Sequence, residues 1–159
     1  MSGLPPLLMM FQLRSLSTST NHGNLLERFY APGPGRHDFN DLVVRHQQDV
    51  FVTDTAANEL YRFDQVNRHF TPVVLSRPLF YPNGITLSGD GSSLYVADII
   101  GVLWIDLRNN NVQELDPGRR DTLAGIDGMY WYKGSLVGVQ YGTSAYRVTR
   151  WYLSPEGCA

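Results

Sequence analysis

Short segments in which apolar and polar residues alternate, separated by turn-forming residues, run along most of this chain. The pattern is clearest in residues 81–98, where two alternating segments flank Gly89-Asp90-Gly91. Alternation with a period of two is typical of half-buried β-strands, and an Asp-Gly turn between two such strands is typical of a hairpin. No window carries the i, i+3, i+4, i+7 apolar spacing over the roughly ten residues that a helix needs. The sequence therefore predicts an all-β fold.

The same order of strands and turns returns at a regular interval. Asn40, Asn83 and Asp127 each open one unit and stand 43 and then 44 positions apart. Four short strands within about 40 to 45 residues are typical of one blade of a β-propeller. Residues 24–159 have room for about three such units, whereas closed propellers have about four to eight blades. We therefore expect a β-propeller fragment of about three four-stranded blades, completed by a longer chain or by another chain. Such an arc leaves blade faces exposed, which favours self-association.

Residues 1–23 are expected to form a leader or a partial blade, followed by a partial propeller domain over residues 24–159. Their apolar run, residues 4–11, is shorter than the about 20 residues of a membrane-spanning helix. No basic segment precedes it, so no secretory signal is expected. The run is either a strand remnant or an unstructured leader. The Ser, Thr, Asn and Gly residues at 17–24 then predict a loop.

Composition narrows the class of partner. The 159 residues fit one domain, the formal net charge is -2, and the 13 basic residues are scattered. Neither nucleic acid nor a membrane is therefore an expected partner. The single cysteine, Cys158, excludes an internal disulfide and a cysteine-based metal site. With neither a disulfide nor a secretory signal expected, a cytoplasmic location is favoured.

The hairpin at residues 81–98 also carries a family resemblance. Residues 81–88, with Gly89-Asp90-Gly91 and residues 94–98, resemble the signature blade of the senescence-marker-protein/gluconolactonase family, the regucalcin-like six-bladed propellers. Phe39-Asn40-Asp41 and residues 126–129 are two further matches, in order and at blade spacing. The resemblance covers about residues 25–153 and implies that the blades belong to a six-bladed propeller.

In that family one divalent cation, calcium or zinc, lies at the centre of the propeller. The resemblance implies that Asn83 and Asp127 are metal ligands. It also implies that Asn40 lines the same cavity, as a ligand or through bound water and substrate. Amide and carboxylate oxygens suit a hard cation, and residues that open a blade face the central channel. The cation would polarise the carbonyl of a lactone, with Asp127 as the general base.

Two departures from the family pattern leave the activity open. No residue matches the glutamate ligand that the family supplies from its first blade, because Glu27 lies too close to Asn40. The family often has an arginine two positions before this asparagine to hold substrate, and Asp38 stands there instead. The resemblance implies divalent-metal-dependent hydrolysis of a lactone or related ester, with a sugar-acid-like substrate, and the site is expected to be incomplete in this chain. One alternative is a non-catalytic propeller that binds a small ligand or a partner protein, and another is a partial sequence with no independent function.

The remaining candidates are polar residues near these motifs. His37 is either a loop histidine or a substrate contact or proton carrier. Gln140, at a strand end where the family often places a pocket residue, is a candidate for the pocket. Asp54 and Asp98 also follow strands and are expected to accept backbone N–H groups in the next turn. No Gly-x-Ser-x-Gly motif is present, so the sequence gives no support to a serine nucleophile.

Overall fold

The structure, a computed structural model, describes residues 7–10, 14–46, 49–119 and 121–154. All regular secondary structure in these residues is β-strand, arranged in four antiparallel sheets. The first sheet contains β1 (Leu7–Met10), β2 (Ser15–Ser19) and β3 (Leu25–Tyr30). The second contains β4 (Phe39–Arg45), β5 (Asp49–Asp54), β6 (Glu59–Asp64) and β7 (His69–Pro72). The third contains β8 (Ile85–Leu87), β9 (Ser93–Ala97), β10 (Val102–Asp106) and β11 (Val112–Glu114). The fourth contains β12 (Ile126–Trp131), β13 (Ser135–Gln140) and β14 (Arg147–Tyr152).

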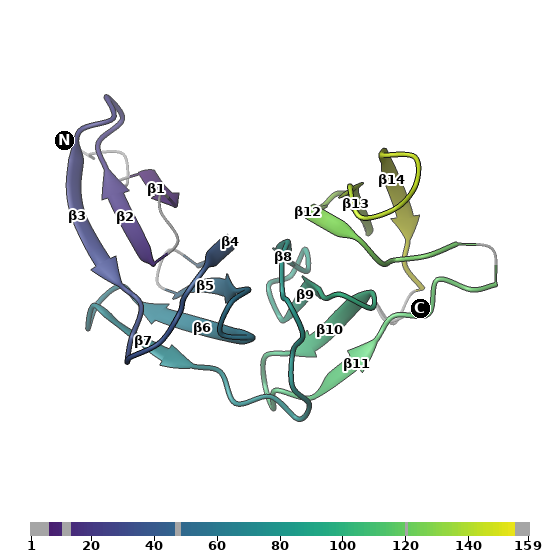
Figure 1. Ribbon diagram of the computed structural model, residues 1–159, viewed down its shortest axis with the longest axis horizontal. Helices are drawn as coiled ribbons and strands as arrows, with labels where there is room; N and C mark the ends of the chain where they lie inside the picture. Colours follow the sequence, from purple (N-terminus) through teal and green to yellow (C-terminus); the bar gives the residue numbers. More distant parts are fainter. Residues whose placement is uncertain (1–6, 11–13, 47–48, 120, 155–159) are drawn as a thin grey trace.

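The four sheets follow one another around an open arc, with β1, β4, β8 and β12 on its inner side (Figure 1). Within each sheet the strands lie in sequence order, so the chain runs from the inner to the outer edge. β4 lies beside β8, and β8 lies beside β12. This arrangement confirms the predicted all-β fold built from propeller blades. No helix with the length and hydropathy of a membrane span occurs in the described residues.

The number of sheets differs from the sequence expectation of about three blades, because β1, β2 and β3 form a sheet of their own. The predicted loop at residues 17–24 is wrong for residues 17–19, which belong to β2. Ser17 is buried there, because β2 pairs with β1 on one side and β3 on the other. The β2–β3 hairpin crosses residue 23, so this sheet takes strands from both sides of the expected domain boundary.

The core consists of three apolar layers, each between two successive sheets. The first layer includes Leu16 and Phe63, the second includes Phe51 and Leu94, and the third includes Tyr95 and Leu136. Burial of one such side chain stabilises a fold by about 1.5 to 3 kcal/mol. Because each layer needs both of its sheets, neighbouring sheets stabilise one another.

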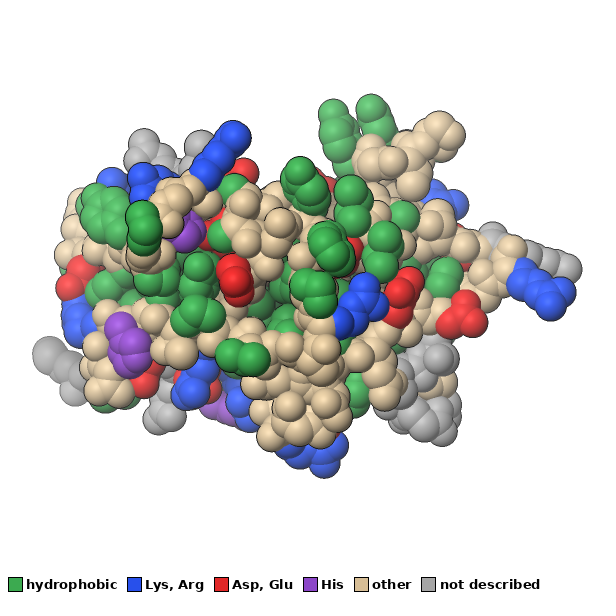
Figure 2. Space-filling model, turned by 60° about the horizontal axis from the view of Figure 1, so that its bottom comes forward, with side chains coloured by type: hydrophobic (Ala, Val, Ile, Leu, Met, Phe, Trp, Pro, Cys, Tyr) green, Lys and Arg blue, Asp and Glu red, His purple; other side chains and the backbone are tan. Residues whose placement is uncertain are grey.

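The outer face of the fourth sheet is exposed and apolar. Tyr130, Val139, Val148 and Tyr152 share this face, and they are 67%, 41%, 70% and 74% exposed. Figure 2 shows apolar side chains exposed among acidic and basic ones on one face of the molecule. Self-association through exposed blade faces would need an exposed apolar surface such as this one. Self-association itself stays a prediction.

Two aspartates anchor the segments that lead into the inner strands. Asp54 Oδ1 accepts a hydrogen bond from Asp38 N, and Asp98 Oδ2 accepts one from Phe80 N, both over 2.8 Å. Each aspartate also caps the turn that follows it, which confirms the role predicted from the sequence. The donors in these turns are Ala57 N and Ile100 N. The two carboxylates therefore fix where the chain enters β4 and β8.

Candidate functional site

The side chains of Asn83 and Asp127 meet beside the first residues of β8 and β12. Asn83 Nδ2 donates a hydrogen bond to Asp127 Oδ1 over 3.3 Å. Asn83 Oδ1 is buried and has no hydrogen-bond partner among the described residues, whereas Asp127 is exposed. A buried amide oxygen without a donor is unfavourable, and this unpartnered oxygen belongs to the side chain that contacts the Asp127 carboxylate.

A close approach of two backbones brings this pair together. A Cβ added to Gly84 would lie 2.9 Å from the backbone oxygen of Asp127, so only glycine lets β8 run this close to β12. Hydrogen bonds to its backbone N–H and C=O hold Asn83 in place. Its N–H donates to Ala97 O over 2.9 Å, and the Thr53 hydroxyl donates to Asn83 O over 2.7 Å.

Asn40 lies on β4, in the neighbouring sheet, and is linked to this site through Thr55. Asn40 Nδ2 donates to Thr55 Oγ1 over 3.1 Å, and the Thr55 hydroxyl donates to Pro82 O over 2.6 Å. Within the part of the chain that the structure describes, no hydrogen bond joins Asn40 directly to Asn83 or Asp127. Of the three blade-opening residues, Asn83 and Asp127 are therefore in contact, whereas Asn40 lies in the neighbouring sheet.

Asp41, which the sequence did not single out, joins the second sheet to the third next to this site. Its Oδ2 accepts a hydrogen bond from Ile85 N over 3.0 Å, which joins β4 to β8, and its Oδ1 accepts one from Leu42 N over 2.8 Å. Burial raises the pKa of the Asp41 carboxyl above its usual value, and the negative charge of Asp127 adds to the rise, although the two N–H groups oppose it. Asp41 therefore lies within electrostatic range of Asp127.

His37 is buried and does not line the pocket that contains Asn83 and Asp127. Its Nδ1 lies 2.7 Å from Asp54 Oδ2, and its ring lies against Phe39 and Tyr61, with centroids 6.5 and 6.4 Å away. The structure therefore shows His37 packed beside a buried carboxylate, with its Nε2 buried and without a hydrogen-bond partner among the described residues.

Gln140 is fully buried at the end of β13. Its Nε2 donates to Thr122 O and Ala124 O, both over 2.9 Å, and its Oε1 accepts from Arg147 Nε over 2.6 Å. These bonds tie the segment before β12 to the fourth sheet, as the two aspartates do in the second and third sheets. Because its polar atoms are used in this way, Gln140 lies outside the pocket wall where the sequence placed it.

Asn83 and Asp127 lie in a pocket of about 340 Å³ between the third and fourth sheets. Its wall also includes Tyr81 and Tyr141, which are exposed and which the sequence did not identify as site residues. Tyr141 stacks on Tyr146, with ring centroids 4.5 Å apart. A ligand in this pocket would therefore contact aromatic rings beside the side-chain oxygen atoms of Asn83 and Asp127.

Tyr81 adopts a backbone conformation that most side chains disfavour. Its φ is +52°, in the left-handed region, where bulky residues are uncommon. A hydrogen bond from Tyr81 N to Asn58 Oδ1, 2.8 Å long, holds this conformation from the second sheet. Strained residues of this kind are concentrated at functional sites, which supports a role for the Tyr81 ring at the pocket.

The variant Tyr81→Gly is expected to be about 1 kcal/mol more stable than Tyr81→Ala, because glycine removes the left-handed strain that alanine keeps. Urea unfolding of the two purified variants measures the difference. Both variants lack the ring, so any effect that the ring has on ligand affinity should be the same in both. Equal unfolding midpoints would contradict the strained conformation.

The donor atoms of this site suit a hard divalent cation such as calcium. Asn83 Oδ1 and the Asp127 carboxylate are oxygen donors, and calcium takes about six to eight oxygens, whereas zinc sites favour nitrogen and sulfur. No group of three or more His, Cys, Asp and Glu side chains that could hold a metal ion occurs in residues 7–10, 14–46, 49–119 and 121–154. The cation implied by the family resemblance therefore fits Asn83 and Asp127 as two ligands, with amides, backbone oxygens, water or substrate as the others.

No family model and no curated protein match the sequence. Solved structures do match the fold. A streptogramin B lyase matches with a TM-score of 0.57 and 17% identity, over 91% of this chain and 50% of that chain. A candidate 6-phosphogluconolactonase from Bacteroides fragilis matches with a TM-score of 0.61 and 13% identity, over 91% of this chain and 49% of that chain. Another from Bacteroides uniformis matches with a TM-score of 0.61 and 15% identity, over 99% of this chain and 55% of that chain.

At these identities the similarity concerns the fold alone. The chain spans about half the length of these three structures. The comparisons and the four radial sheets agree on one architecture. The chain forms an arc of β-propeller blades, and this fold is similar to that of a streptogramin B lyase and of candidate 6-phosphogluconolactonases.

Proposed function

We propose that this protein hydrolyses a lactone or a related ester at the pocket of Asn83 and Asp127, with one divalent cation as cofactor. The observation that carries the proposal is the buried, unpartnered Asn83 Oδ1 beside the exposed Asp127 carboxylate in an open pocket. The shared fold with two candidate 6-phosphogluconolactonases supports a sugar-acid lactone as the substrate class.

Each side chain of the pocket has a role in this proposal. Asn83 Oδ1 and Asp127 would hold the cation, which when bound supplies Lewis acidity toward the carbonyl oxygen of the substrate. The Asp127 carboxylate accepts a proton from the water that attacks the carbonyl carbon. The bond between this carbon and the ring oxygen then breaks, and the ring oxygen takes up a proton, which gives a hydroxy acid. Tyr81 and Tyr141 contact the substrate ring at the pocket rim.

Hydrolysis of δ-gluconolactone by the full chain, followed in a pH-stat, tests the proposal. Turnover above the spontaneous rate should fall when EDTA is added and return when calcium is added. Asp127→Asn is expected to lower kcat/KM by at least about 100-fold, because it removes the base and a charged ligand. Asp116→Asn removes an exposed carboxylate outside this pocket and should leave turnover unchanged.

A non-catalytic propeller that binds a small ligand or a partner protein is the second candidate. Asp38 favours it, since it stands where the family often has a substrate-holding arginine. Turnover that survives both EDTA and Asp127→Asn would overturn metal-dependent hydrolysis. Cation-independent binding of the lactone without turnover would favour the binding protein.

A further inference from the structure

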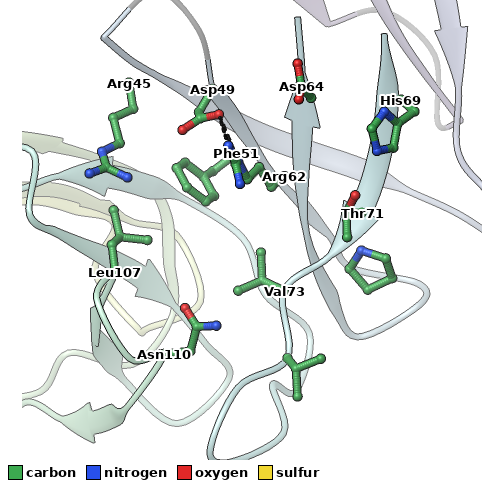
Figure 3. A pocket seen from close by; sticks show the side chains of 12 residues that line it. Arg45, Asp49, Phe51, Arg62, Asp64, His69, Thr71, Val73, Leu107 and Asn110 are labelled. Atoms are coloured by element: carbon green, nitrogen blue, oxygen red, sulfur yellow. Dashed lines mark hydrogen bonds and ion pairs between the residues drawn. The ribbon is translucent and has the colours of Figure 1, made fainter. Parts of the chain in front are cut away.

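A second cavity, of about 480 Å³, lies between the second and third sheets (Figure 3). It is located at the strand ends opposite the pocket of the proposed hydrolase. Arg45, the last residue of β4, pairs with Asp49 at this end, whereas Phe39 pairs with Asp54 at the other end. Asn40 and Arg45 are five residues apart on one strand, which corresponds to roughly 17 Å. The two cavities are therefore separate.

The acidic side chains of this cavity already have partners. Arg62 Nε and Nη2 lie 2.8 and 2.7 Å from Asp49 Oδ1, the interaction drawn in Figure 3. Asp64 Oδ1 accepts hydrogen bonds from Val66 N and Asn67 N, over 2.8 and 2.9 Å, within its own turn. Neither carboxylate therefore needs a further cation.

Arg45 is different from these groups. Among the described residues its Nε is buried without a hydrogen-bond partner, and Arg45 forms no ion pair with them. Figure 3 shows its guanidinium beside Leu107, with Asn110 farther along the same side of the cavity. A buried guanidinium N–H without an acceptor is unfavourable, and the Arg45 side chain lines the cavity with no carboxylate of the described residues to balance its charge.

We propose that this cavity binds a small polyhydroxylated anion, with its carboxylate or phosphate group on Arg45. The planar fork of N–H donors on arginine matches the oxygens of either group. Thr71 and Asn110 supply a hydroxyl and an amide for the hydroxyl groups of the ligand, and Val73 and Leu107 contact its carbon atoms. The volume of about 480 Å³ lies within the range of small-molecule sites, about 300 to 1,000 Å³.

Calorimetric titration of the full chain with three matched probes tests this site. Glycerate carries a carboxylate, glycerol 3-phosphate carries a phosphate, and glycerol carries no charge. At least one anion is expected to bind, and glycerol is not. Arg45→Gln should weaken binding of that anion at least tenfold, whereas Arg28→Gln, which changes an exposed arginine on β3, should not. Asp127→Asn should also bind the anion as the wild type does.

Urea unfolding without ligand separates a binding role for Arg45 from a structural one. Arg45→Gln should unfold at the same or a higher urea concentration than the wild type, because it removes a buried N–H that has no acceptor. Binding of glycerate alone would assign a carboxylate ligand, and binding of glycerol 3-phosphate alone would assign a phosphate ligand. The proposal is overturned if neither anion binds at millimolar concentration, if glycerol binds equally well, or if Arg45→Gln keeps wild-type affinity.

Discussion

Asp54→Ala is expected to destabilise the protein by about 3 to 5 kcal/mol, because it removes a buried carboxylate that pairs with three polar groups of the chain. The Asp54 side chain is 0% exposed. It accepts hydrogen bonds from Asp38 N and Ala57 N over 2.8 and 3.0 Å, and it lies 2.7 Å from His37 Nδ1. Alanine would leave all three groups without this acceptor. Urea unfolding of the purified chain measures the effect.

Two further variants make the Asp54 experiment specific. Asp54→Asn keeps the shape and one oxygen for the two N–H groups, so it should lose only about 1 to 2 kcal/mol. Asp116→Ala removes an exposed aspartate and should stay within about 0.5 kcal/mol of the wild type. A loss below about 1 kcal/mol for Asp54→Ala would mean that this side chain does not hold the entry into β4.

The strands that depend on local alternation could be predicted from the sequence. β8 and β9 lie within the hairpin expected at residues 81–98, and Gly91 in its turn has a φ of +70°. β2 could not be predicted in the same way, because its serines and threonine look like a loop. Its conformation depends on pairing with two neighbours, for example Ser17 with Arg28 of β3.

Part of the candidate site could also be predicted from the sequence. The repeat places Asn83 and Asp127 at equivalent positions, and adjacent inner strands bring equivalent positions together. Asp41 gave no such signal, because glycine stands at its equivalent position in the two later repeats. The conformation of Tyr81 depends on Asn58 in another sheet, and no local pattern encodes a contact of that kind.

For His37 and Gln140, sequence position was a poor guide to the surroundings of the side chain. Both are polar residues near motifs, which made them candidates for a pocket. In the structure each is buried, with hydrogen-bond partners inside the protein. A sequence gives the type of a side chain, whereas burial and partners depend on how distant segments pack. The geometry of the site itself depends on how closely the inner strands β8 and β12 approach each other.

Gly84→Ala tests that approach and is expected to destabilise the protein by about 3 kcal/mol. The added Cβ would lie 2.9 Å from the backbone atoms Asp127 O and Met129 N, and backbone atoms cannot move away by a change of rotamer. β8 and β12 would have to separate, which would break the 3.3 Å contact between Asn83 and Asp127. We therefore also expect calcium affinity, measured by calorimetry, to fall at least tenfold.

Gly128→Ala is the matched control for this experiment, because Gly128 lies on β12 beside Asp127 and a Cβ there meets nothing within 4 Å. It should change the free energy of unfolding by no more than about 0.5 kcal/mol and leave calcium affinity unchanged. Equal behaviour of Gly84→Ala and Gly128→Ala would contradict the close approach of β8 and β12. Loss of stability in Gly84→Ala without loss of calcium affinity would instead separate the close approach from the cation site, and it would exclude the pairing of Asn83 with Asp127 as the basis of cation binding.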